Sequence, residues 1–245
     1  MSAGSATTAP IPIFKLFHQW IFSSIGKKTI VALTGLLLVL FLLGHMLGNL
    51  SIFLGPNALN TYAAKLQSLG ALLWVIRLGL LAVFGAHIYF TVLLILENQA
   101  ATPTKYQAAN HVKATVFAKT MRYTGPIIFL FVLFHLAHFT LGYVQPEVFH
   151  LMDAEGRHDV YSIVILGFQN VPISLFYIIS LILMTCHLNH GIGSLFQTFG
   201  INNRATRELL NRAGEIFSWI ICLGFISIPI AVLLGILHPL TALPF

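Results

Sequence analysis

The sequence predicts an all-α integral membrane bundle of five transmembrane helices. Of its 245 residues, 57% are hydrophobic and only 8% are charged, whereas a soluble domain carries roughly 25% charged residues. Five apolar stretches are each long enough to cross the hydrocarbon core, which requires a helix of ~20 residues. Because so few charged side chains cannot cover a surface in water, we expect lipid to cover most of the protein.

The expected spans follow one another with short connections. They cover residues 29–50, 72–96, 125–143, 171–196 and 216–237. Pro126 and Pro172 fall in the first turns of the third and fourth spans, where a missing N–H costs little. Pro229 falls inside the fifth span and predicts a kink there, which neighbouring helices can accommodate.

A second, shorter helix is expected ahead of the first span. Apolar residues recur there at helical spacing, which is typical of a helix lying in the membrane interface. These residues are Ile13, Phe14, Leu16, Phe17, Trp20 and Ile21. We therefore divide the chain into an N-terminal segment with an interfacial helix, residues 1–28, and a five-helix transmembrane domain, residues 29–245.

The basic residues predict the orientation. Ten of the 13 Lys and Arg residues lie in the N-terminal segment and in the loops after the second and fourth spans: Lys15, Lys27, Lys28, Lys105, Lys113, Lys119, Arg122, Arg204, Arg207 and Arg212. The opposite side has only Lys65, Arg77 and Arg157. Since positive charge marks the cytoplasmic side, the N-terminus is expected in the cytoplasm.

Several kinds of chemistry lack the residues they need. The sequence has no glycine-rich phosphate loop, no clustered cysteines and no pair of carboxylates within a span. Cys186 and Cys222 both lie in apolar runs and do not have metal-ligand spacing. Thirteen basic residues are too sparse for a nucleic-acid surface. Functional side chains must therefore be sought among the histidines.

Eleven histidines are unusual in so apolar a chain. Six lie within the predicted spans: His45, His87, His135, His138, His187 and His190. An ionisable side chain at that depth is rare, and it marks either a functional site or a neutral histidine bonded to a neighbouring helix.

Depth sorts four of these histidines into two levels. Counting about 1.5 Å per residue places His45 and His135 in the outer half of the membrane and His87 and His187 in the inner half. Each level takes one histidine from the first helical hairpin and one from the second. Haem iron accepts axial imidazoles from facing helices, whereas zinc usually requires three or four ligands at one level. Two stacked bis-histidine haem sites are therefore predicted.

Small residues and alternative ligands complete this site hypothesis. Gly44, Gly48, Gly85 and Gly191 flank the candidate ligands and are expected to leave room for a macrocycle. His138 and His190 share a helix face with His135 and His187 at i+3, so spacing alone leaves both choices open. Greater depth favours His135 and His187.

The same segments resemble a known family. They are SSIGKKTIVALTGLLLVLFLLGHMLGNL from Ser23, GPNALNTYAAKLQSLG, GAHIYFTVLLILENQAA, FHLAHFTLGY and CHLNHGIGSLFQTFG. In this order they resemble the di-haem cytochrome b (b558-type) membrane-anchor subunit of succinate dehydrogenase and fumarate reductase. The resemblance covers nearly the whole chain.

The resemblance implies a function and a set of ligands. The outer haem would take His45 and His135, and the inner haem would take His87 and His187. The protein would anchor a flavoprotein subunit and an iron–sulfur subunit on the cytoplasmic face of a bacterial cytoplasmic membrane. It would pass electrons through two haem b groups to a quinone, usually menaquinone, while the dicarboxylate chemistry stays on the other subunits.

One departure and two alternatives remain. The position of His190 can be another residue in relatives, which favours His187 as the ligand. The departure is that none of the seven acidic residues matches the membrane carboxylate that some relatives place near the quinone. The chain could instead anchor another dehydrogenase, such as a hydrogenase or a formate dehydrogenase. It could also be a haem-free transporter that relays protons through its histidines.

Overall fold

The computed structural model describes residues 12–101 and 116–240, and their regular structure is helical. Five helices are long and apolar enough to cross a membrane, which confirms the predicted all-α bundle. They are α2 (Ser24–Leu50), α4 (Ala71–Ala100), α5 (Val116–His135), α8 (Val171–Thr198) and α9 (Arg207–Leu233). The molecule is therefore a multi-pass membrane protein.

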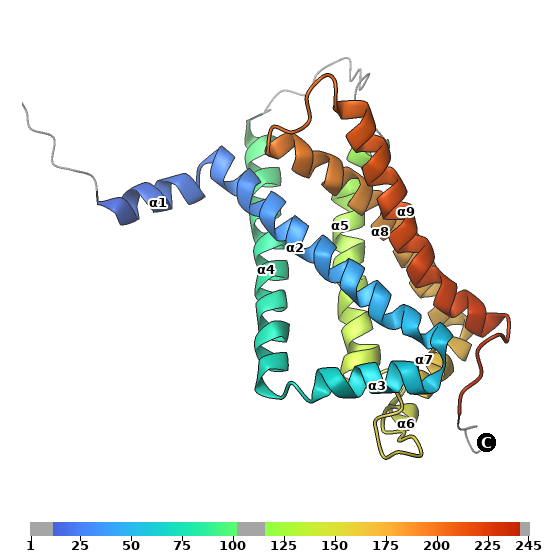
Figure 1. Ribbon diagram of the computed structural model, residues 1–245. Helices are drawn as coiled ribbons and strands as arrows, with labels where there is room; N and C mark the ends of the chain where they lie inside the picture. The colour runs from blue at the N-terminus through green and yellow to red at the C-terminus, as the bar shows by residue number, and fades with distance from the viewer. Residues whose placement is uncertain (1–11, 102–115, 241–245) are drawn as a thin grey trace, which may run out of the picture.

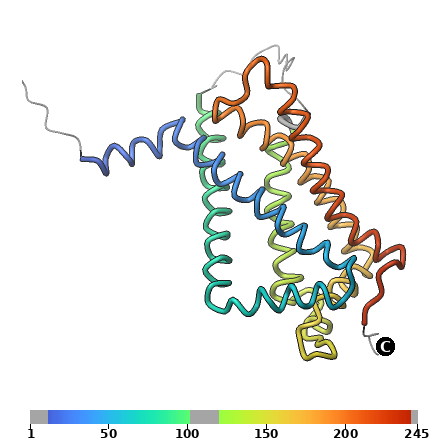
Figure 2. The backbone as a smooth tube through the Cα atoms, in the orientation of Figure 1, coloured from blue at the N-terminus to red at the C-terminus, as the bar shows by residue number. Residues whose placement is uncertain are grey.

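The first four spanning helices form two hairpins, α2 with α4 and α5 with α8. Helix α2 joins them, because it also packs against α8. Helix α2 crosses the bundle obliquely and packs against α4, α8 and α9, while α5 packs against α8 (Figure 1). Within the described helices, α4 packs closely only against α2. Figure 2 shows α4 at one edge of the bundle and α8 beside α9 at the other. The histidines of the two hairpins consequently face one another between helices whose backbones are not in close contact.

Short helices lie at both ends of the bundle. Helix α1 (Ile13–Ile21) projects sideways where α2 begins, and its apolar side chains are exposed to what would be lipid or headgroups, Phe14 to 77%. This confirms a helix in the segment where the interfacial one was predicted. The opposite end holds η1 (Ser51–Leu54), α3 (Pro56–Gln67), α6 (Pro146–Phe149) and α7 (Val160–Gln169) (Figure 1).

Local sequence explains where the spanning helices begin and end. The Ser23 hydroxyl accepts a hydrogen bond from the Gly26 N–H and caps α2, so this helix starts ahead of residue 29 and runs across the expected boundary at residue 28. Asn170 caps α8, and Pro172 lies in its first turn, as predicted. Helix α9 ends at Leu233, before the position expected, because Gly235 adopts a positive φ of 67°.

The prediction for the third span was wrong at its start. Helix α5 begins at Val116, so Pro126 lies inside the helix and not in its first turn. Hydropathy locates the stretch that lipid can cover, whereas the helix continues into the polar residues ahead of it. Pro229 likewise lies inside α9, as expected.

The other end of the third span is irregular. After His135 the chain forms a π-helical turn, η2 (Leu136–Thr140), in which the Leu141 N–H donates to the Leu136 carbonyl oxygen at 2.8 Å. Gly142 ends it with a φ of 70°, and the Phe149 ring packs where a side chain would stand. Single π turns concentrate at functional sites, and this one carries His138.

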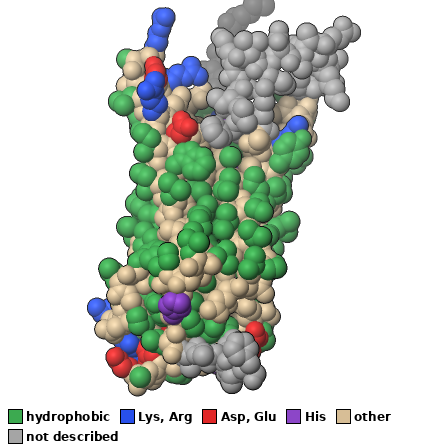
Figure 3. Space-filling model, turned by 90° about the vertical axis from the view of Figure 1, so that its right-hand side faces the viewer, with side chains coloured by type: hydrophobic (Ala, Val, Ile, Leu, Met, Phe, Trp, Pro, Cys, Tyr) green, Lys and Arg blue, Asp and Glu red, His purple; other side chains and the backbone are tan. Residues whose placement is uncertain are grey.

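Charged side chains gather at the two ends of the molecule. Figure 3 shows a broad apolar band between them, as expected for a surface in contact with lipid. At the end where α2 begins, the buried Lys27 ammonium pairs with Glu97 from the last turns of α4. This ion pair joins the two helices of the first hairpin. Of the predicted cytoplasmic basic residues, Lys105 and Lys113 lie outside the described residues, as does the side chain of Lys119.

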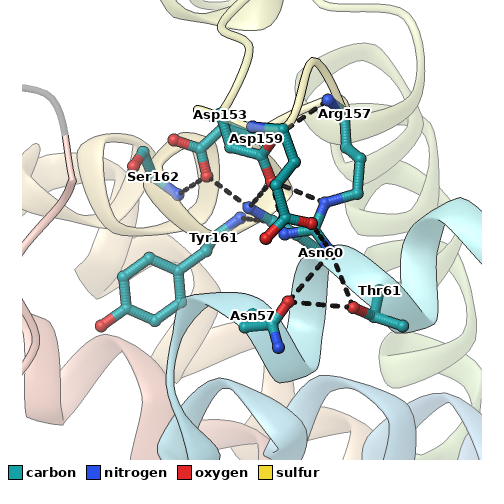
Figure 4. A network of polar contacts seen from close by, with 9 residues as sticks. Asn57, Asn60, Thr61, Asp153, Arg157, Asp159, Tyr161 and Ser162 are labelled. Atoms are coloured by element: carbon teal, nitrogen blue, oxygen red, sulfur yellow. Dashed lines mark hydrogen bonds and ion pairs between the residues drawn. The ribbon is translucent and has the colours of Figure 1, made fainter.

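A polar network closes the opposite end of the bundle (Figure 4). Asn60 of α3 is 1% exposed and donates from its amide nitrogen to Asp159 at 2.9 Å and to Asp153 at 3.2 Å. Its amide oxygen accepts from the Tyr161 N–H at 2.9 Å. The Arg157 guanidinium pairs with Asp153 and reaches α3. The network therefore ties the loop of the first hairpin to that of the second.

The Asp153 carboxylate is held in its charged form. Burial raises the pKa of this carboxyl, but hydrogen bonds from Arg157, from the Glu155 N–H and from Asn60 outweigh burial and keep the pKa below its usual value. The Asp153 carboxylate consequently stays ionised over the whole physiological pH range.

We expect Asn60→Ala to destabilise the protein strongly. The substitution leaves the fully buried Asp159 carboxylate and the Tyr161 N–H without their amide partner, at a cost of about 3 kcal/mol. Thermal unfolding in detergent should show a Tm lower by roughly 6–12 °C. Gln67→Ala, at an exposed position of the same helix and outside this network, is the matched control and should change the Tm little. Equal Tm values for the two variants would contradict this role of Asn60.

Candidate functional site

The two predicted outer histidines come together. His45 near the end of α2 and His135 at the end of α5 have ring centroids 5.8 Å apart and nearly perpendicular planes, at 83°. With metal–nitrogen bonds of about 2.0 Å on each side, two imidazole centroids flanking one metal ion lie roughly 6 Å apart. Phe41 stacks on His45, and Phe131 lies against His135. The separation and the apolar surroundings thus fit axial ligation of a haem iron.

A hydrogen-bond chain assigns the proton on His135. His138 lies 2.9 Å through Nε2 from the Gln145 amide oxygen, which only accepts, so His138 donates from Nε2. Its Nδ1 then accepts from the Tyr177 hydroxyl at 3.0 Å. The Tyr177 oxygen lies 3.4 Å from His135 Nδ1 and accepts from it. This arrangement leaves the lone pair of His135 on Nε2, as an iron ligand requires.

His138 is placed differently from a ligand. Its side chain is 3% exposed, and both of its ring nitrogens take part in the hydrogen bonds to Tyr177 and Gln145. Neither nitrogen therefore retains a lone pair for iron unless these contacts break. This geometry favours His135 over His138, in line with the choice made from depth.

The inner pair stands on α4 and α8. His87 stands on α4, and both His187 and His190 stand on α8. His87 Nδ1 is 3.1 Å from the Thr34 hydroxyl of α2, and His187 Nδ1 is 3.3 Å from the Thr124 hydroxyl of α5. Each inner histidine is thus held by a hydroxyl from the partner helix of its own hairpin.

The glycine predictions met mixed outcomes. No atom lies within 4 Å of a Cβ added at Gly44, Gly85 or Gly191, so none of these three glycines packs tightly against a neighbouring helix, and Gly44 and Gly85 are exposed. Gly48 was assigned wrongly, because Tyr62 from α3 packs against it and its hydroxyl would lie 2.5 Å from an added Cβ. Gly48 therefore allows α3 to approach α2.

Three polar residues whose side chains contact the rings of the candidate ligands were missed, namely Thr34, Thr124 and Tyr177. For the two threonines the sequence does hold a signal. Thr-Gly precedes His45 by eleven residues in TGLLLVLFLLGH and precedes His135 by the same number in TGPIIFLFVLFH. This repeat between the first and third spans predicts equivalent positions for its members. Tyr177 has no comparable signal, since an aromatic residue in a span is usually a packing residue.

The donor set fits a haem better than a metal ion alone. Within residues 12–101 and 116–240, no three or more His, Cys, Asp or Glu side chains are grouped so as to hold a metal. Pairs of imidazoles from facing helices, bordered by phenylalanines and open glycines, are instead what axial ligation between helices requires.

Comparison with protein-family models, with curated proteins and with solved structures gave no match. The class that the fold defines is an all-α membrane protein with five spanning helices. The functional argument therefore rests on the histidine pairs and on the residues that hold them.

Proposed function

We propose that this protein is the membrane anchor and electron-transfer subunit of a succinate:quinone oxidoreductase and that it holds two b haems. The observation that carries the proposal is the facing pair His45 and His135, whose ring centroids lie 5.8 Å apart between two helices. His87 of α4 and His187 of α8, each in contact with a threonine hydroxyl at another level of the same hairpins, support it. The resemblance of the helix sequences to the di-haem anchor family supports it.

The residues of this chain have distinct tasks in such a subunit. His45 and His135 would hold the outer haem, and His87 and His187 would hold the inner one. A bound haem supplies a one-electron carrier inside the apolar core. The surrounding aromatic residues exclude water, and burial together with hydrogen bonds to the ligands sets the potentials. His138 and Tyr177 fix the orientation of His135.

The sequence of transfer follows from the two levels. Thr34 and His45 lie on the same face of α2, eleven residues and therefore about 16 Å apart. Because Thr34 contacts His87, the inner level is separated from the outer level by about three helical turns. Electrons from succinate would enter at the inner level from a cytoplasmic flavoprotein and iron–sulfur partner, pass to the outer level and reduce a quinone, with menaquinone as the expected species.

The partner subunits are expected at the end where α2 and α9 begin. The exposed basic residues Arg204, Arg207 and Arg212 gather there, and Lys27 is already paired with Glu97. Surface charge of one sign guides association with a partner of complementary charge. The same charges also set topology, so binding must be tested directly.

Co-purification tests this proposed role. In a mild detergent and at low salt, the tagged protein should bring down a flavoprotein and an iron–sulfur protein with succinate dehydrogenase activity. The double variant Arg204→Glu with Arg207→Glu should reduce their yield by roughly tenfold, as expected when like charges replace complementary ones. Lys65→Glu, exposed at the opposite end, is the matched control. Recovery of a hydrogenase or formate dehydrogenase, or of no redox partner, would overturn the proposal.

A further inference from the structure

Thr34 contacts the ring of His87 in a way that assigns its proton. The Thr34 hydroxyl donates within α2 to the Ile30 carbonyl oxygen at 2.7 Å, so its single proton is already used. His87 Nδ1 lies 3.1 Å from the same oxygen and in this arrangement donates to it, and the His87 side chain also makes a hydrogen bond with the backbone of Val31. The lone pair of His87 is then on Nε2, the nitrogen on the far side of the ring.

Thr124 repeats this arrangement in the second hairpin. Its hydroxyl donates within α5 to the Met121 carbonyl oxygen at 3.3 Å and lies 3.3 Å from His187 Nδ1. Both threonines are buried, at 9% and 2% exposure. By analogy with Thr34, we assign the donor role to His187 Nδ1, which leaves the lone pair of His187 on Nε2.

The glycine after each threonine gives the ring its room. A Cβ added at Gly35 would lie 3.3 Å from His87 Cε1, and one added at Gly125 would lie 3.9 Å from His187 Cε1. The first of these distances is tighter than ordinary van der Waals contact, so a larger residue at position 35 would push the imidazole away from α2. The Thr-Gly pair therefore supplies a hydrogen-bond acceptor for the imidazole and, in the adjacent glycine, room for its ring.

The eleven-residue spacing explains why both pairs work alike. Eleven residues make close to three helical turns, so Thr34 and His45 lie on one face of α2, and Thr124 and His135 lie on one face of α5. The same helix face thus carries a candidate ligand histidine for the outer level and, about three turns away, a threonine hydroxyl that contacts the histidine of the inner level. Helix α5 is unbroken from Thr124 to His135, and α2 from Thr34 to His45.

We propose that Thr34 and Thr124 are positioning residues that hold His87 and His187 as the Nδ1–H tautomer, with Nε2 directed to the inner haem iron. This inference rests on the proposed function, because it assumes a haem between the two histidines. A hydroxyl that accepts from Nδ1–H orients the ring and makes the imidazole a stronger donor to the metal. Such a donor stabilises the ferric state and lowers the potential of the inner centre.

A competing explanation is that each hydroxyl serves only its own helix. Serine and threonine within spans often bond the carbonyl one turn back, with no functional consequence. Thr29 and Thr198 show this ordinary behaviour, since they bond the carbonyl oxygens of Ile25 and Ser194 in their own helices at 3.0 and 2.9 Å. They are therefore matched controls for Thr34 and Thr124.

The test measures the potential of each b centre by redox titration of the purified complex and compares low-spin EPR spectra. Thr34→Val and Thr124→Val keep the side-chain volume and remove the acceptor. Each should raise the potential of the inner centre and shift its EPR signal, leave the outer centre unchanged, and weaken retention of the inner haem by roughly tenfold. Thr34→Ser and Thr124→Ser retain the hydroxyl and should restore wild-type values.

The outcomes separate this inference from the proposed function. Loss of the inner centre in the valine variants but not in the serine variants would also support the inference. Potentials and spectra that stay at wild-type values in both valine variants, or that shift equally in Thr29→Val and Thr198→Val, would overturn it while leaving the di-haem function intact. Absence of any b haem in the wild-type protein would refute the proposed function itself.

Discussion

Replacing His135 with alanine is expected to remove the outer haem and to leave the inner haem in place. In the proposed arrangement the substitution would delete one axial ligand of the pair with His45, and low-spin bis-histidine ligation could not form without it. His45→Ala should have the same effect, whereas His87→Ala or His187→Ala should remove the inner haem. The measurement is the haem content and the reduced-minus-oxidised spectrum of each purified variant, in which one of two b components should disappear.

The matched controls are the neighbouring histidines three residues further along. His138→Ala takes the same side-chain volume from η2, yet it removes hydrogen bonds to Tyr177 and Gln145 and not an iron ligand. Both haems should therefore remain, with at most a shift of the outer centre. His190→Ala serves in the same way for His187. If an alanine at residue 138 or 190 abolished a haem while one at residue 135 or 187 did not, the ligand assignment would be wrong.

Succinate-to-menaquinone turnover in sealed vesicles is expected to depend strongly on the membrane potential. In the proposed arrangement electrons enter at the inner level and leave at the outer level, so charge crosses much of the low-dielectric core. Each unit charge that crosses the full potential exchanges about 2.3 kcal/mol per 100 mV, which can help to drive an unfavourable reduction of menaquinone. An uncoupler should therefore slow this turnover severalfold.

The control for this experiment bypasses the membrane segment. Succinate oxidation by a soluble dye that accepts electrons from the cytoplasmic subunits should be indifferent to the uncoupler. Quinone reduction near Ser23 and Ser24, at the cytoplasmic end, would move no charge across the membrane. A menaquinone rate unaffected by collapse of the potential would thus rule out outer-face reduction and leave the outer haem without an assigned role.

Hydropathy predicted the number and order of the spanning helices but located their ends less well. The lipid core requires an apolar stretch of defined length, and this makes the five spans visible in sequence. The ends depend on caps and on polar extensions, as the start of α5 at Val116 and the cap at Ser23 illustrate. Pro126 was misplaced for this reason, since a proline is tolerated within a spanning helix when its neighbours compensate.

For the candidate site, depth along each helix sufficed to select His45 and His135 as partners. This worked because helical rise is regular and because antiparallel hairpins bring equal depths together. Contacts between different helices were beyond such counting. Tyr62 covers Gly48 and Tyr177 reaches His135, and both contacts depend on helix packing that one sequence does not reveal. The Thr-Gly repeat could have been found, because it depends only on spacing within one helix.

The most direct test of the whole account is the number of b haems bound by one chain. A pyridine haemochrome assay on the purified complex, combined with quantitative amino-acid analysis, gives this ratio. Two haem b groups per chain, both low-spin and bis-histidine ligated by EPR, are predicted from the pairs His45 with His135 and His87 with His187. A ratio of one would contradict the paired assignment, and a ratio of zero would contradict the proposal that this protein carries electrons.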